Sequence, residues 1–295
     1  MKPILTPKDL ADAIGVSESS IKRWADEGKL RATRTAGGHR RIAIADAIRF
    51  VRATEAILVR PEILGMSDLA VLSLGERSPG EDVAADLHRL LFEGAEAESR
   101  GLLLSLYLSG WSVAQIVDGP VQSALARIGD LWRHDEAGIF IEHRAVDLCM
   151  QGLSQIRSLL PLPNRDSPSA TGGAPAGDPY LLPSLGIALA LQEEGYRAVN
   201  LGPDCPYSTW LEACEQSRPS IFWLSCSSQD AAQKGVDRQL TDLLRALSDD
   251  VVVAVGGAAA PPSGLPKSPR LFAGSSIGEL VAFVRGLRAS GTDPS

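Results

Sequence analysis

The sequence lacks the features of membrane-inserted, secreted and disulfide-bonded proteins. It has no run of about eighteen apolar residues, so no membrane-spanning helix and no membrane partner are expected. The N-terminus, MKPILTPKDLADAIG, has no charged flank followed by a long apolar core, which argues against a signal peptide. The cysteines form no CxxC pair and have no histidine at ligand spacing, which argues against a zinc knuckle; they are Cys149, Cys205, Cys214 and Cys226. We therefore expect a cytoplasmic protein with buried or inert thiols.

What the sequence does contain is enough apolar material for several cores and an uneven distribution of charge. Its 295 residues, 44% of them hydrophobic, predict two or three domains. The net charge of -7 by itself disfavours nucleic-acid binding. However, residues 1–60 carry twelve Lys and Arg against seven Asp and Glu, whereas the remainder carries seventeen against twenty-nine. This asymmetry indicates a basic, nucleic-acid-binding N-terminal domain, called the head below, on an otherwise acidic chain.

Residues 1–78 are predicted to form a DNA-binding domain. Thr6 and Ser17 stand where helix N-caps are expected, and Gly28 follows the second helix. The stretch LRATRTAGGHRRIAI then alternates around a Gly-Gly turn, as a two-stranded wing does. Hydroxyls and cations on the second helix can reach base edges and phosphates if this helix enters a major groove, and the glycines let the wing approach a phosphate backbone. The candidate DNA-binding residues are Ser19, Ser20, Lys22, Arg23, Arg34, Gly37, Gly38, His39, Arg40 and Arg41.

The rest of the chain is predicted to be a helical bundle followed by an α/β domain. Apolar residues spaced by three and four, with breaks at Gly110, Gly119-Pro120 and near Gly138, predict a four-helix bundle over residues 79–160. Residues 161–177 are rich in Pro, Gly and Ser and form a linker or a weak first strand. Short apolar strands then alternate with helices, which predicts a parallel, doubly wound, Rossmann-like domain over residues 178–290. Ligands of such sheets bind beyond the carboxyl ends of the strands.

The stretch WRHDEAGIFIEH, from Trp132 to His143, concentrates chemically active residues in the bundle. A metal site is disfavoured because Glu142 and His143 are adjacent on one helix and form no i, i+4 ligand pair. An acid/base site is disfavoured because no nucleophile or substrate-orienting loop is evident nearby. The wall of a ligand pocket remains as the third interpretation, and a core position for Trp132 is the alternative to it.

The first seventy residues resemble the MerR-type winged helix-turn-helix. Members of that family carry the pattern T-x-x-x-x-A-x-x-x-G-V-S-x-x-x-[IL]-x-R-W ahead of a basic wing, and the matching text here is TPKDLADAIGVSESSIKRWADEGKLRATRTAGGHRRI. The resemblance implies binding, as a dimer, to double-stranded DNA at a roughly palindromic operator. It also implies that Trp24 is a core residue of the head.

The whole chain resembles the cobalamin-sensing photoreceptors of the CarH/LitR type, in which Trp, nine further residues and then Glu-His occur in a helical bundle that precedes a doubly wound domain. The resemblance implies a transcriptional repressor, not an enzyme, whose bundle lies over the upper face of adenosylcobalamin. It implies that Trp132 packs against the adenosyl group and that Glu142 and His143 line the same pocket. It further implies that the cofactor builds a homotetramer from two dimers, which light takes apart.

The resemblance fails at the lower cobalt ligand. Related domains carry D/E-x-H-x-x-G, S-x-L and Gly-Gly elements, and the first reads DPYLLP here, with Asp178 kept and Tyr180 in place of the histidine. The second element keeps Ser225 but places Ser227 where leucine is expected, whereas the glycine pair is intact as Gly256 and Gly257. Arg133 also follows the bundle tryptophan where light-responsive relatives often have histidine. A phenol must lose its proton, with a pKa near 10, before it binds a metal, and it then suits ferric haem better than alkylcobalt.

Three ligand states therefore remain open from the sequence. Cobalamin binds with its own base or water below cobalt, another tetrapyrrole such as haem or a bilin occupies the cleft, or the site is empty and the bundle serves only assembly. A cobalamin-dependent methyl carrier or mutase-like enzyme is a remote alternative, because it leaves the basic head unexplained and relies on the missing histidine.

Overall fold

The computed structural model describes residues 4–71, 82–132, 137–232, 235–259 and 265–289. The chain forms two compact units. The first unit consists of Met1–Ser112 and Gly119–Pro161, and the second consists of Val113–Asp118 and Leu162–Ser295. Within the described residues, no helix combines the length and apolar character needed to cross a membrane.

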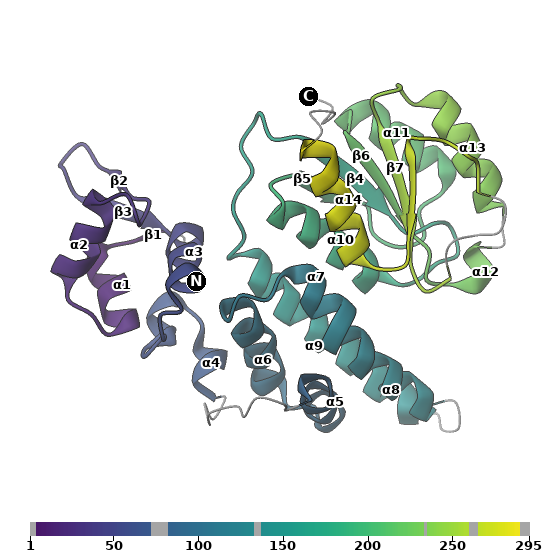
Figure 1. Ribbon diagram of the computed structural model, residues 1–295. Helices are drawn as coiled ribbons and strands as arrows, with labels where there is room; N and C mark the ends of the chain where they lie inside the picture. The colour runs from purple at the N-terminus through teal and green to yellow at the C-terminus, as the bar shows by residue number, and fades with distance from the viewer. Residues whose placement is uncertain (1–3, 72–81, 133–136, 233–234, 260–264, 290–295) are drawn as a thin grey trace. The chain divides into compact units, whose positions relative to one another are not determined.

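The N-terminal part of the first unit is a helix-turn-helix with a two-stranded wing (Figure 1). Thr6 caps the first helix in a capping box with Asp9, Pro7 stands at its first position, and Ser17 caps the second helix, as expected from their types. Trp24 packs against Phe50 with ring centroids 5.1 Å apart. The elements are β1 (Ile4–Leu5), α1 (Pro7–Ile14), α2 (Glu18–Asp26), β2 (Thr33–Arg34), β3 (Arg40–Ala43) and α3 (Ile44–Thr54).

A bundle of helices completes the first unit. Gly119-Pro120, predicted to break a helix, lies instead in a π-helical turn, η2 (Val117–Val121), which continues directly into the next helix. Such a turn absorbs the missing N–H of proline without ending the helix. The other elements are η1 (Pro61–Leu64), α4 (Ser67–Val71), α5 (Val83–Glu93), α6 (Glu96–Leu108), α8 (Gln122–Trp132) and α9 (Ala137–Arg157).

The second unit is a parallel five-stranded α/β domain, as the alternating pattern predicted. Its strand order is β5-β4-β6-β7-β8, so the order reverses between β4 and β6. A sheet of this order binds ligands at the carboxyl ends of the two strands that flank the reversal. The strands are β4 (Ser169–Gly173), β5 (Arg197–Asn200), β6 (Ile221–Ser225), β7 (Val252–Gly256) and β8 (Leu271–Gly274), and the helices are α7 (Val113–Ile116), α10 (Leu181–Glu193), α11 (Tyr207–Ser217), α12 (Gln229–Ala232), α13 (Val236–Ala246) and α14 (Ile277–Ala289).

The segment that the sequence left as a linker or a weak strand contains β4, which pairs with strands on both sides. Small residues suit this position because the ring of Trp223 lies against the strand. A Cβ atom on Gly172 would come within 2.1 Å of the Trp223 carbonyl oxygen and 2.4 Å of its ring. The glycines of this segment therefore allow close packing of a strand and do not mark a linker.

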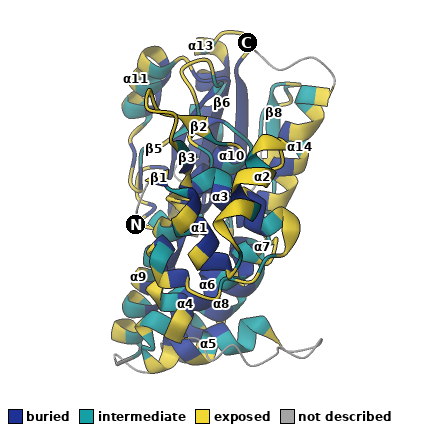
Figure 2. Cartoon of the chain, turned by 90° about the vertical axis from the view of Figure 1, so that its left-hand side faces the viewer, coloured by how far each residue is buried: buried dark blue, intermediate teal, exposed yellow. Residues whose placement is uncertain are grey.

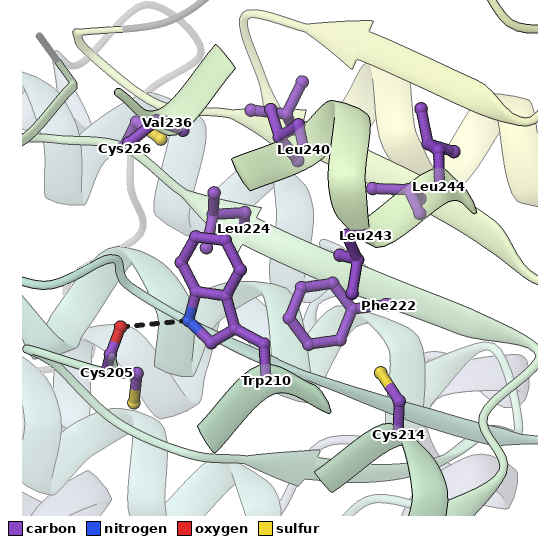
Figure 3. Close-up of a cluster of buried hydrophobic side chains, with 12 residues drawn as sticks. Cys205, Trp210, Cys214, Phe222, Leu224, Cys226, Val236, Leu240, Leu243 and Leu244 are labelled. Carbon is purple, nitrogen blue, oxygen red and sulfur yellow. Dashed lines mark hydrogen bonds between the residues drawn. The ribbon is translucent and has the colours of Figure 1, made fainter. Parts of the chain in front are cut away.

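The sheet separates two layers of helices, and side chains alternate between its faces. On one face, Trp223 donates its indole N–H to Ser184 of α10 (3.1 Å). On the other face, Phe222 and Leu224 pack with Trp210 of α11 and Leu240 of α13 in a buried cluster (Figure 3). The inner strands β4, β6 and β7 are almost entirely buried, whereas α2 and the wing are largely exposed (Figure 2).

Candidate functional site

The predicted DNA-reading residues of α2 lie on its outer side. Lys22 forms an ion pair with Glu18 (2.8 Å), and Arg23 approaches Glu27 (3.8 Å). All four side chains are exposed, and ion pairs of this kind contribute little in water, so both cations can exchange their partners for phosphate. Of the predicted residues on this helix, Ser19, Lys22 and Arg23 are exposed and Ser20 is half-buried.

The wing is a tight hairpin whose turn is held by its own backbone. Thr35 donates its N–H to the carbonyl of His39 (2.9 Å), and Gly38 donates to the carbonyl of Thr35 (2.8 Å). Gly38 has a φ of 77°, in the left-handed region that favours glycine. The wing residues are exposed at Arg34, Gly37, Gly38 and His39 and half-buried at Arg40 and Arg41.

A carboxylate that the sequence analysis did not single out joins the recognition helix to the wing. Oδ1 of Asp26, the last residue of α2, accepts hydrogen bonds from Nη2 of Arg40 (2.5 Å) and Nη2 of Arg34 (3.5 Å). The hydrogen bond from Arg40 and the positive charge of both arginines hold the pKa of Asp26 below its usual value. The only local signal was an acidic residue within a basic segment, which does not reveal a partner fourteen residues away.

The predicted upper-face residues lie at one end of the helical hairpin formed by α8 and α9. Trp132 is the last residue of α8, while Glu142 is half-buried and His143 is exposed in α9. As neighbours on one helix, Glu142 and His143 point about 100° apart. Arg133 and His134 lie outside the described residues.

Aromatic side chains near this end of the bundle were not predicted. Phe140 of α9 and Phe92 of α5 are both exposed, at 66% and 44%. The guanidinium of Arg144 lies 5.2 Å from the centre of the Phe140 ring and donates to the carbonyl of Phe92 (2.7 Å). This arrangement ties α5 to α9 beside Glu142 and His143.

Asp178 bridges the point where the strand order reverses. Its side chain is fully buried, and its Oδ2 accepts the backbone N–H groups of Ser227 (2.6 Å) and Ser228 (2.9 Å), which follow β6. Its Oδ1 accepts the N–H of Tyr180 (3.1 Å). The loop after β4 is also joined to the loop after β5, because Asp204 donates its N–H to the Asp178 carbonyl (2.9 Å). Through its carboxylate and its backbone carbonyl, Asp178 therefore holds together the loops that form the expected ligand edge.

Of the other predicted residues of this edge, Ser225 has a hydroxyl without a hydrogen-bond partner in the described chain, whereas Gly256 and Gly257 allow close packing of the backbone. The hydroxyl of Ser225 is buried and has no hydrogen-bond partner among the described residues. A Cβ atom on Gly257 would come within 2.3 Å of the Cys226 carbonyl oxygen, and one on Gly256 within 2.8 Å of the Gly274 carbonyl oxygen. The glycine pair therefore allows neighbouring backbones to approach. Ser225 is left as the polar group that a ligand could satisfy.

The α/β domain has no histidine for axial ligation of cobalt. All four histidines of the sequence precede residue 162. Burial raises the pKa of the Cys214 and Cys226 thiols to about 12, so they stay protonated near neutral pH. Tyr180 is 48% exposed at the N-cap of α10. The orphaned hydroxyl of Ser225, in contrast, fits a corrinoid that brings its own hydrogen-bonding groups.

Comparisons with known proteins match each part of this architecture. A family model described as a helix-turn-helix domain matches residues 4–53, and one described as a B12 binding domain matches residues 83–157. The chain is 28% identical over 255 residues to the HTH-type transcriptional repressor CarA of Myxococcus xanthus, an alignment that covers 85% of each chain. The monomethylamine corrinoid protein of Methanosarcina barkeri is similar in structure, with a TM-score of 0.54 and 15% identity over 71% of this chain and 100% of that one.

These similarities agree with the fold built from the residues. The likeness to the corrinoid protein concerns the fold alone. The chain therefore joins an N-terminal helix-turn-helix DNA-binding domain, a helical cap and a parallel five-stranded α/β domain with the fold of corrinoid proteins, and it is a distant homologue of a transcriptional repressor.

Proposed function

We propose that this protein is a DNA-binding transcriptional repressor of the CarH/LitR type whose sensor binds a corrinoid without a cobalt ligand from its α/β domain. The observation that carries the proposal is the presence, in one chain, of a helix-turn-helix head ahead of a B12 binding domain. The similarity to a repressor over 85% of both chains supports the regulatory role. A basic head has no use in a methyl carrier or mutase, so we propose a regulator without catalytic activity.

The DNA-binding step uses α2 and the wing of the head, which we assign to residues 1–78. We propose that α2 enters the major groove, where Ser19 and Arg23 reach bases or phosphates, while Arg34 and Arg41 of the wing contact neighbouring phosphates. The exposure of Ser19, Arg23 and Arg34 supports this assignment, and Arg41 is half-buried on the same wing. A homodimer on a roughly palindromic operator places two such heads one helical turn apart.

The sensing step uses the bundle, assigned to residues 79–160, and the α/β domain, assigned to residues 178–290 together with β4. We propose adenosylcobalamin as the ligand, retaining its own base or water below cobalt, with the hydroxyl of Ser225 bound to a polar group of its nucleotide tail. We propose that Trp132, Glu142 and His143 contact the upper ligand. These contacts couple corrinoid binding to tetramer assembly and make the assembly sensitive to light. Support comes from the unpartnered Ser225 hydroxyl and from the position of the three residues at one end of the α8–α9 hairpin.

The experiment that tests this proposal begins with selection of binding sites from random DNA duplexes by the purified full-length protein. Its affinity for the selected site is then measured in the dark with and without adenosylcobalamin, and again after illumination, with sizing of each sample. A recovered palindrome bound more tightly in the presence of dark adenosylcobalamin supports both steps. Failure to select any sequence contradicts DNA-specific regulation.

A regulator that binds no ligand is the second candidate, and the contacts of Asp178 favour it. The three backbone N–H groups that it binds, together with the backbone bonds between the loops, satisfy much of this edge without a cofactor. Operator binding and mass that are unchanged by adenosylcobalamin, in dark or light, would select this candidate. The same assay with haem tests a tetrapyrrole bound through Tyr180, because tyrosinate ligation of ferric haem has a distinct absorption spectrum.

A further inference from the structure

The helix-turn-helix head contains a connection between its two predicted DNA-contacting elements. Asp26 ends α2, whereas Arg34 and Arg40 stand directly opposite each other on β2 and β3. Oδ1 of the one carboxylate accepts a hydrogen bond from both guanidinium groups. Like charges directly opposite each other on paired strands destabilise a hairpin, so the carboxylate between them also relieves repulsion within the wing.

The two arginines differ in how far they remain available to DNA. The side chain of Arg40 is 18% exposed, and its bond to Asp26 is the shorter of the two. The side chain of Arg34 is 63% exposed and lies 3.5 Å from the same oxygen. A guanidinium has five N–H donors and Asp26 takes one from each arginine. Arg40 therefore anchors the wing, while Arg34 keeps donors that can face a phosphate.

We propose that Asp26 is a specificity-determining positioning residue, which fixes the wing relative to the recognition helix so that both elements meet one operator in a single register. This inference rests on the proposed DNA-binding function. A carboxylate near DNA repels phosphate, so it lowers affinity for every sequence. A wing that is already held in place loses less conformational freedom when the protein binds DNA. This gain counts only where helix and wing contacts form together, which is at the specific site. Asp26 thus reduces general affinity and increases discrimination.

The test compares Asp26→Ala with Asp12→Ala in the full-length protein. Asp12 is exposed on α1 and pairs with no cation in the described part of the chain, so both changes remove one negative charge from an exposed position of the head. Dissociation constants are measured for the selected operator and for a scrambled duplex over a range of salt concentrations. Thermal unfolding of each variant, followed by circular dichroism, verifies that the head is folded.

We expect both variants to bind the scrambled duplex more tightly than the wild type does. Only Asp26→Ala is expected to reduce the ratio of specific to non-specific affinity, by about tenfold, a loss comparable to that of one mismatched base pair. Asp26→Glu keeps the carboxylate and is expected to retain most of the ratio. The same ratio in Asp26→Ala and Asp12→Ala overturns the inference.

A double-mutant cycle separates the positioning role from a general effect on the head. If Asp26 acts by holding Arg40, the Asp26→Ala change has no further effect on the ratio in an Arg40→Ala background. Additive losses in the double variant contradict the inference. Failure of the wild type to select any DNA sequence contradicts the proposed function instead, so the two failures are distinguishable.

Discussion

Replacing Asp178 by alanine is expected to destabilise the α/β domain far more than removal of an exposed carboxylate. The change removes the acceptor of three backbone N–H groups, at 2.6 Å from Ser227, 2.9 Å from Ser228 and 3.1 Å from Tyr180, inside a site that is fully buried. A hydrogen bond to a charged group contributes about 1.5–3 kcal/mol, and unpaired buried donors add their own desolvation cost. Because bonds that share one carboxylate are not additive, we expect a total loss of about 3–5 kcal/mol.

Two measurements examine this expectation. Urea unfolding of the full-length Asp178→Ala and Asp166→Ala proteins, followed by tryptophan fluorescence, gives the loss of stability, since Asp166 is exposed in the turn before β4 and serves as the control. Hydrogen exchange then reports the amides of Ser227 and Ser228 directly and is expected to accelerate only in Asp178→Ala. Stability within about 0.5 kcal/mol of the control, together with unchanged exchange at both amides, would refute the bridging role.

The isosteric change Asp178→Asn distinguishes charge from shape. An amide has one oxygen acceptor, so when that oxygen faces Ser227 and Ser228 its NH2 group faces the N–H of Tyr180, and two donors meet. We expect a loss smaller than that of the alanine variant but still measurable. Equal stability of Asp178→Asn and the wild type would mean that a neutral acceptor suffices at this edge.

Three further predictions concern other parts of the chain. Arg23→Ala is expected to weaken binding to all DNA sequences and to lower the slope of log affinity against log salt by about one, and unchanged affinity and slope in a binding titration contradict a phosphate contact. The hydrogen bond from Arg100 holds the pKa of Asp68 below its usual value. Their pair therefore stabilises the bundle above the unfolded pKa of about 4, and this stabilisation is lost as pH falls through the folded pKa. The stability difference between wild type and Asp68→Asn, measured in urea titrations, should shrink over the same fall in pH. Because burial raises the pKa of Cys214 and Cys226 to about 12, neither thiol should react with iodoacetamide in the native protein at pH 7.5, and rapid alkylation detected by mass spectrometry would contradict their burial.

Much of the fold was predictable because its signals are local. Thr6, Pro7 and Ser17 mark helix starts through hydrogen bonds and backbone geometry within three residues, and the structure forms these caps. The alternation of short apolar strands with helices predicted the parallel sheet, because a right-handed crossover is the ordinary way to join such strands.

The wrong and open points arose where distant contacts override local preference. Gly119-Pro120 was expected to end a helix, but a π-turn carries the chain through. The Asp118 carboxylate accepts the N–H groups of Ile277 (3.0 Å) and Gly278 (2.8 Å) at the start of α14, 159 and 160 residues along the chain. Such a partner is invisible in sequence, although it anchors the segment at this turn.

The sequence by itself determined the order of the domains, the helix-turn-helix with its basic wing, and the absence of a histidine from the loop after β4. These features depend on residue type and on spacing along the chain. Only the tertiary structure decided that the Gly-rich segment is a central strand, that Asp178 binds the loop after β6, and that Asp26 joins α2 to the wing. The physical reason is that a hydrogen bond or a close backbone approach depends on positions in space, and residues 14 to 50 positions apart meet only after the strands and helices have packed.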